Sequence, residues 1–107
     1  MSAVHDILRE EYSRLEKRKD RYSRELESLP KGTISRKRIR NNDYYYLAYR
    51  SADKVKFDYL GKKEAPRLRE IESQLGRRKE IEGKLKQVNI SLEEIGKSLR
   101  GRKQGSI

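Results

Sequence analysis

A segment with the two-residue periodicity of β-strands interrupts a chain that otherwise follows the periodicity of helices. Residues 35–50 carry five basic residues and four tyrosines, and tyrosine is enriched in strands. On both sides of this segment, apolar residues recur at intervals of three and four, as they do on one face of a helix. This order of patterns indicates an α+β fold in which a small sheet lies between two helices.

The first helix is predicted over residues 2–29. Pro30 follows it directly, and a proline disfavours the helical conformation of the residue before it. Gly32 strengthens the stop signal. Four apolar residues recur every seven positions, the spacing of a coiled-coil seam: Leu8, Leu15, Tyr22 and Leu29.

The second long helix is predicted over residues 64–100. Pro66 suits its first turn, and apolar residues continue at helical spacing from Leu68 to Leu99. Ser91 and Glu94 form a capping-box pattern, so two alternatives stay open here: one continuous helix, or a helix broken near residues 89–91. Residues 101–107 are basic and contain glycine, and we expect them to form a disordered tail.

Residues 33–60 are predicted to form a three-stranded antiparallel meander. Asn41 and Asn42 suit a tight turn because Asn tolerates positive φ, and residues 51–53 suit a three-residue loop. In the resulting register one face packs on a helix: Tyr45, Leu47, Tyr49, Val55, Phe57 and Tyr59. The other face is then wet and cationic: Tyr44, Tyr46, Ala48, Arg50, Lys54, Lys56 and Asp58.

Together these elements predict a single domain over residues 1–100 with the order αβββα. Two long antiparallel, coiled-coil-like helices would support the small antiparallel sheet. Only 33% of the chain is hydrophobic, so the core must be thin. Two apolar stripes leave area to spare on a narrow hairpin, which makes a homodimer a further expectation.

The charge distribution predicts an anionic partner. The formal net charge is +11, and residues 31–63 alone carry ten Lys or Arg against three Asp or Glu. Cations neutralise phosphates and tyrosine rings can stack on bases, so we expect non-enzymatic nucleic-acid binding, with duplex DNA favoured over RNA. The candidate binding residues lie on the meander: Arg36, Lys37, Arg38, Arg40, Tyr44, Tyr46, Arg50, Lys54 and Lys56.

The sequence gives little support for a catalytic site or a metal site. The chain has no cysteine and one histidine, His5, near the N-terminus, which excludes thiolate catalysis and histidine-based triads or metal clusters. We therefore expect no cofactor and no metal. Acidic residues near the start argue against a signal peptide, and no apolar stretch is long enough for a membrane span, so a cytoplasmic location is expected.

Two resemblances accompany these patterns. Leu29-Pro30-Lys31-Gly32, the run Tyr44-Tyr45-Tyr46-Leu47-Ala48-Tyr49-Arg50 and the flanking helices resemble a family of short uncharacterised prokaryotic and phage proteins over residues 26–86. That resemblance implies the architecture and brings no established activity. More weakly, the hairpin resembles the three-stranded arm-site DNA-binding domain of phage-type tyrosine recombinases, in which a sheet enters the major groove.

A protein-binding module is the alternative function. In that case the helical hairpin would dock on a partner, such as a host nuclease or its nucleic-acid complex, as a phage inhibitor of bacterial defence would. An apolar stripe left on the exposed side of the helices would favour this alternative.

Overall fold

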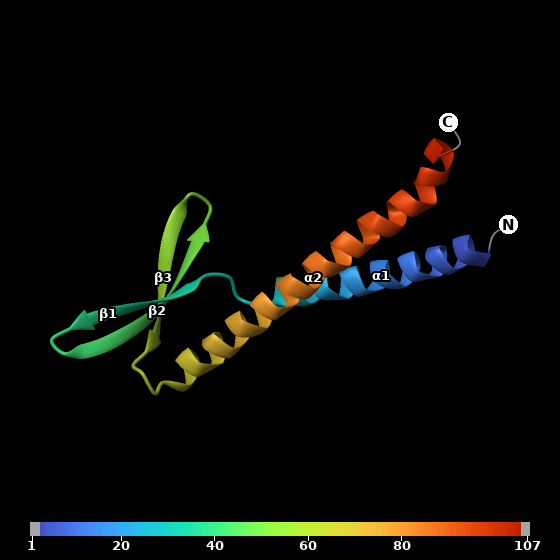
Figure 1. Ribbon diagram of the computed structural model, residues 1–107. Coiled ribbons are helices and arrows are strands. Elements are labelled where there is room, and N and C mark those ends of the chain that lie inside the picture. The colour runs from blue at the N-terminus through green and yellow to red at the C-terminus, as the bar shows by residue number, and fades with distance from the viewer. Residues whose placement is uncertain (1–2, 106–107) are drawn as a thin grey trace. The chain divides into compact units, whose positions relative to one another are not determined.

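The computed structural model describes residues 3–105, with side chains as far as Gly101. Its elements confirm the predicted α+β class and the order helix, three strands, helix: α1 (Ala3–Ser28), β1 (Thr33–Ile39), β2 (Asn42–Ser51), β3 (Lys54–Gly61) and α2 (Pro66–Gly105) (Figure 1). The chain divides into two compact units. The helical unit joins α1 up to Glu27 with α2 from Ile81 onward, and the sheet unit spans residues 28–80. That both units act as one domain stays a prediction.

Helix α2 is continuous, which was one of the two alternatives open from the sequence. It passes through residues 89–91 without interruption and extends to Gly105. Residues 101–105, predicted as part of a disordered tail, are therefore helical, because the Arg, Lys and Gln between the two glycines are good helix formers. Residues 106 and 107 of the predicted tail lie outside the described residues.

The helical unit is held by a narrow apolar seam between antiparallel helices. Leu15 of α1 is buried with Val88 and Leu92 of α2, and Tyr12, Tyr22 and Ile95 pack around them. The ring of Tyr12 lies close to Gly96 of α2: a Cβ atom there would be in ordinary van der Waals contact with a ring carbon at 3.7 Å. Ile81 is fully buried. The seven-residue spacing in the sequence thus located this seam.

The sheet unit has its own core, on one face of the sheet. Leu47 of β2, Leu60 of β3 and Leu68 of α2 are buried together. Partly buried side chains from β1, β2, α2 and the segment just before α2 surround them: Ile34, Tyr45, Tyr49, Ala65, Ile71 and Leu75. The first turns of α2 therefore cover the packed face of the sheet, as the sequence predicted for Tyr45, Leu47 and Tyr49.

One close backbone approach and one side-chain hydrogen bond hold the segment through which the chain enters this unit. Gly32 has a φ of 133°, and a Cβ atom there would lie 2.3 Å from the carbonyl oxygen of Ala48, so only glycine fits where the chain passes β2. Arg78 Nη1 donates a hydrogen bond of 3.1 Å to the carbonyl oxygen of Leu29. This bond satisfies a carbonyl just beyond the end of α1, where helices leave acceptors free. Arg78 lies three residues from both Leu75 and Ile81, and this hydrogen bond gives a polar side chain a partner at that position on α2.

The register between β2 and β3 differs from the prediction by one residue. The connecting turn has two central residues, not three: Ser51 pairs with Lys54, and Ala52 adopts a positive φ of 54°. Arg50 therefore lies opposite Val55, and Ala48 opposite Phe57. A shift of one residue moves every side chain of a strand to the other face.

The shifted register corrects the predicted faces. Val55, Phe57 and Tyr59 were predicted to pack on a helix, but they are 52%, 59% and 50% exposed. Lys54, Lys56 and Asp58 lie instead on the side of Leu47, where they too are exposed. The alternation of Val55, Phe57 and Tyr59 gave a wrong prediction because both faces of the sheet are open to solvent near the β2–β3 turn. Burial therefore does not select the register there. Leu60 follows the same alternation onto the side of Leu47 and is buried there, next to an irregularity in the pairing of Tyr45 and Tyr46.

Among the described residues, none of the helices is both long enough and apolar enough to cross a membrane.

Candidate nucleic-acid interface

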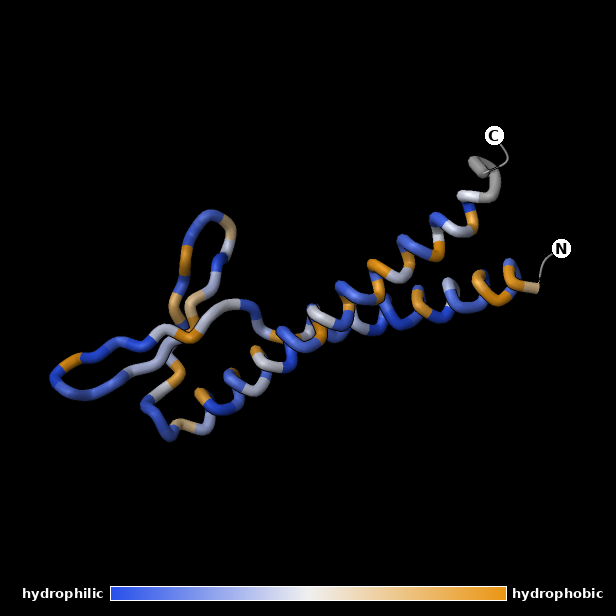
Figure 2. The backbone as a smooth tube through the Cα atoms, in the orientation of Figure 1, coloured by the Kyte–Doolittle hydropathy of each residue, from blue (hydrophilic) through white to orange (hydrophobic). Residues whose placement is uncertain are grey.

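The sheet consists of two hairpins that share β2. Residues 42–48 of β2 pair with β1 and residues 45–51 pair with β3, so the middle of β2 is paired on both sides. Figure 1 shows the hairpins projecting in different directions from this common strand. The β1–β2 hairpin is drawn almost entirely in hydrophilic colours, whereas β3 carries hydrophobic segments (Figure 2).

The turn of the β1–β2 hairpin is basic and conformationally specialised. Arg40 and Asn41 have φ values of 50° and 67°, and two positive φ values at the centre of a two-residue turn define type I′. The turn is thus centred one residue earlier than predicted, and Ile39 pairs with Asn42. The Asn42 side-chain amide donates to the Arg40 carbonyl at 3.5 Å. The turn holds Arg40 at the exposed tip.

The structure divides the predicted binding residues between two hairpins and two faces. Cross-strand pairs put Arg36, Arg38, Lys54 and Lys56 on the face of Leu47. The same pairings put Lys37, Tyr44, Tyr46 and Arg50 on the opposite face, with Arg40 in the turn between β1 and β2. The sequence had placed Lys54 and Lys56 beside Tyr44, Tyr46 and Arg50, and this placement is wrong for the reason given above for the register.

One predicted cation already has an anionic neighbour. Arg38 Nε lies 4.0 Å from Asp43 Oδ1, and the two residues are cross-strand partners. That carboxylate oxygen is buried and accepts no hydrogen bond within the described part of the chain. The guanidinium of Arg38 is therefore partly engaged within the hairpin, which makes it a weaker phosphate ligand than Arg36 or Lys37.

Four aromatic side chains gather on the face opposite the core, and we call them the aromatic face: Tyr44, Tyr46, Phe57 and Tyr59. The ring centroids of Tyr46 and Tyr59 are 5.3 Å apart, and those of Tyr44 and Tyr59 are 6.3 Å apart. Both pairs are tilted, an arrangement that aromatic rings favour. Tyr44, Tyr46 and Tyr59 thus form one cluster of rings, and Phe57 lies two residues further along β3 on the same face.

Cations border the aromatic face. Lys37 Nζ lies 6.0 Å from the ring centroid of Tyr46, and Lys62 Nζ lies 5.6 Å from that of Tyr44. These distances are within the range of cation–π attraction. Arg50 lies on the same face near the second turn. The strand residues that share this face include no carboxylate, because Asp43 and Asp58 lie on the other side.

Three residues of this surface escaped the sequence prediction. Phe57 and Tyr59 were assigned to the core, and Lys62 was not considered. The sequence signal that could have revealed the correct register is the pair Ala52-Asp53, which forms the two central residues of the turn between β2 and β3. A two-residue turn that pairs Ser51 with Lys54 also aligns Tyr46 with Tyr59.

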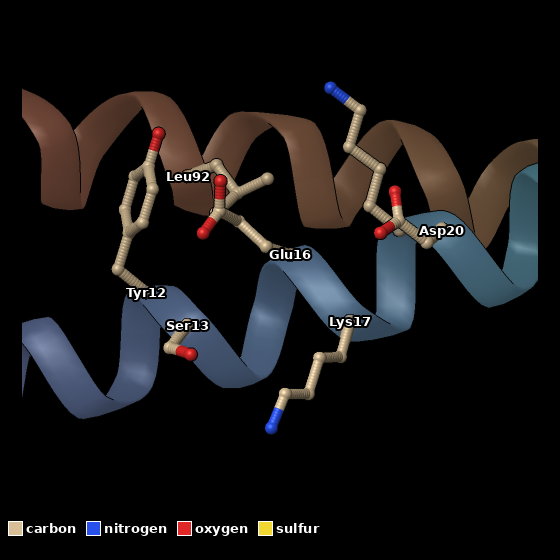
Figure 3. A pocket seen from close by; sticks show the side chains of 7 residues that line it. Tyr12, Ser13, Glu16, Lys17, Asp20 and Leu92 are labelled. Atoms are coloured by element: carbon tan, nitrogen blue, oxygen red, sulfur yellow. The ribbon is translucent and has the colours of Figure 1, made fainter.

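A pocket of the helical unit has the side chains of an ordinary helix surface. A shallow pocket on α1 is lined by Tyr12, Ser13, Glu16, Lys17, Lys19, Asp20 and Leu92. Figure 3 shows Tyr12 directed toward α2 and Lys17 directed away from it. Acidic and basic side chains alternate here, as is typical of a solvated helix surface. Within residues 3–101, no three His, Cys, Asp or Glu side chains form a group that could hold a metal ion.

Comparison with known proteins gives one match. No curated protein and no solved structure matches the chain. A family model described as "Domain of unknown function (DUF6788)" matches residues 8–70, which is more than half of the 107 residues. The match takes in most of α1, the whole sheet and the first turn of α2. The chain therefore belongs to the DUF6788 family.

Proposed function

We propose that this protein binds nucleic acid without catalysing a reaction, and that the sheet is the binding surface. The observation that carries the proposal is the coincidence of an uncompensated positive charge with an exposed aromatic surface on one small sheet. Either feature alone has a structural explanation. Together they match the two chemical parts of a nucleic acid, its phosphates and its bases.

The β1–β2 hairpin supports duplex DNA as the ligand. It carries Arg36 and Lys37 on opposite faces and Arg40 at its tip. A two-stranded ribbon fits the major groove of B-DNA, and cations on both faces of such a ribbon would meet the phosphates on both sides of the groove. The resemblance to recombinase arm-site domains agrees with this mode of binding. Lys54 and Lys56 on the second hairpin would supply further phosphate contacts.

A salt titration with matched variants tests this proposal. Six phosphate contacts would give a slope of about −5 in log K against log salt concentration, at roughly 0.9 per contact. Fluorescence anisotropy with a labelled duplex measures that slope. Removing four of the contacts should lower the affinity strongly and flatten the slope by about 3 to 4. The test variant replaces four residues of the β1–β2 hairpin by Gln: Arg36, Lys37, Arg38 and Arg40.

The control must remove the same charge elsewhere. Four exposed cations of α1 serve this purpose when they are replaced by Gln: Lys17, Arg18, Lys19 and Arg21. If the sheet is the interface, the control keeps most of the affinity and slope. Equal losses in both variants would mean that net charge alone attracts the DNA. Absence of binding by the parent chain at low salt would remove the proposal.

A protein-binding module, such as a phage inhibitor of a host nuclease, is the second candidate. Val4 and Ile7, one helical turn apart on α1, are 56% and 62% exposed. Exposed apolar residues at this spacing suit a helical partner or a second copy of the chain. Ile7→Lys should then abolish partner capture or dimerisation, measured by light scattering, and leave DNA affinity intact.

A further inference from the structure

Phe57 and Tyr59 belong to β3, outside the β1–β2 hairpin that is proposed to enter the groove, and they lie on the face opposite the core. Phe57 and Tyr59 are 59% and 50% exposed, and the neighbouring Val55 is 52% exposed. Contiguous apolar surface of this kind marks interaction sites in soluble proteins. Duplex DNA does not satisfy it, because base faces in a duplex are covered by their stacked neighbours.

Phe57 is placed to accept a planar ligand. Its cross-strand partner is Ala48, whose methyl group is too small to cover a phenyl ring. Tyr59, by contrast, lies between the rings of Tyr44 and Tyr46, which hold it in position. The face thus combines one open ring with one ring that its neighbours fix.

The spacing of the rings suits an extended strand. Phe57 and Tyr59 are two residues apart on β3, which separates them by about 6.6 Å along the strand. Stacked bases in B-DNA are only about 3.4 Å apart. Bases that stack on both rings must therefore be separated from each other, as they are in an extended single strand and not in a duplex.

The cations that surround the aromatic face favour an anionic ligand over an apolar protein segment. Lys37, Arg50 and Lys62 flank the rings, and no carboxylate shares the strand surface. Flexible backbone phosphates can reach cations on either side while their bases lie on the rings. A positive border with central aromatic rings is the common design of surfaces that bind single strands.

We propose that the aromatic face is a binding site for the unpaired bases of single-stranded nucleic acid, with Phe57 as its principal stacking platform. This inference rests on the proposed function, to which it adds a second ligand class at a second place on the sheet. A chain with both sites would bind where paired and unpaired strands meet.

Three probes separate bases from phosphates: a labelled oligothymidylate, an abasic strand of equal length, and a duplex of equal length. The abasic strand keeps the phosphates and lacks the rings. Phe57→Leu keeps an apolar side chain and removes the aromatic face of residue 57, and the 59% exposure of Phe57 means that folding should persist. Val55→Ala is the matched control, since it changes an exposed apolar residue of the same strand and face without removing a ring.

We expect Phe57→Leu to weaken oligothymidylate binding about 5-fold to 150-fold, the effect of about 1–3 kcal/mol per stacked base. Binding of the abasic strand and the duplex should not change, and Val55→Ala should behave like the parent chain. Because the chain contains no tryptophan, Phe57→Trp introduces a single indole reporter. Its fluorescence should be quenched by oligothymidylate and not by the abasic strand.

Equal affinity for the abasic and base-bearing strands would overturn the inference while leaving the proposed function in place. An unchanged affinity of Phe57→Leu together with an unquenched indole in Phe57→Trp would do the same, and would leave the face to a protein partner. Failure of every probe to bind at low salt would overturn the proposed function and this inference with it.

Discussion

Truncating Leu47 should destabilise the protein strongly and truncating Phe57 should hardly change its stability, although the sequence predicted that both residues pack in the core. Leu47 is 7% exposed and lies against Leu60 and Leu68. A buried Leu→Ala change costs about 2–5 kcal/mol, and the thin core allows partial collapse, so we expect about 2–3 kcal/mol. At roughly 4 °C per kcal/mol for a chain of this size, the melting temperature should fall by about 8–12 °C. Phe57→Ala should change the free energy of unfolding by less than about 0.5 kcal/mol.

Urea denaturation followed by near-ultraviolet circular dichroism measures these differences, because Tyr45 and Tyr49 pack around the sheet core and report on its packing. If Leu47→Ala does not fold, Leu47→Met serves instead, with an expected cost below about 1.5 kcal/mol. The reasoning would be refuted if Phe57→Ala destabilised the sheet as much as the Leu47 variant. That result would restore the register in which Phe57 faces the helix.

Further predictions concern backbone conformation. Gly32→Ala should destabilise the chain by at least about 1–3 kcal/mol, because a side chain is strained at this φ and its Cβ atom would collide with the Ala48 carbonyl oxygen. Gly76→Ala is the matched contrast: a Cβ atom there meets nothing within 4 Å, so better helix propensity should raise stability by about 0.5–1 kcal/mol. Chemical denaturation compares the two, and a stable Gly32→Ala variant would contradict the described path beside β2. Ala52→Gly should stabilise the second hairpin by up to about 1 kcal/mol, since Ala pays for positive φ at this turn. A loss of stability, again in a urea titration, would mean that the turn has three central residues.

The sequence determined the elements and their order. Helical spacing with an apolar residue every seven positions located the seam at Leu15, and Pro30 marked the end of α1. The alternation of side chains between two faces around Leu47 identified β2 and the face of β2 that packs in the core. These signals are local, and each concerns residues that are buried on one side, so burial leaves a periodic mark in the sequence.

Tertiary structure decided the composition of the candidate site. Val55, Phe57 and Tyr59 alternate as a packed strand would, yet the covering helix reaches only the part of the sheet near Leu60. Where both faces are open to solvent, the turn sets the register. The two-residue turn at Ala52 places Phe57 and Tyr59 on the face opposite the core, and it places Lys54 and Lys56 on the face of Leu47, where they remain exposed. The basic character of the sheet was thus a property of composition, whereas the membership of the aromatic face follows from a single residue of register between β2 and β3, which no local periodicity specifies.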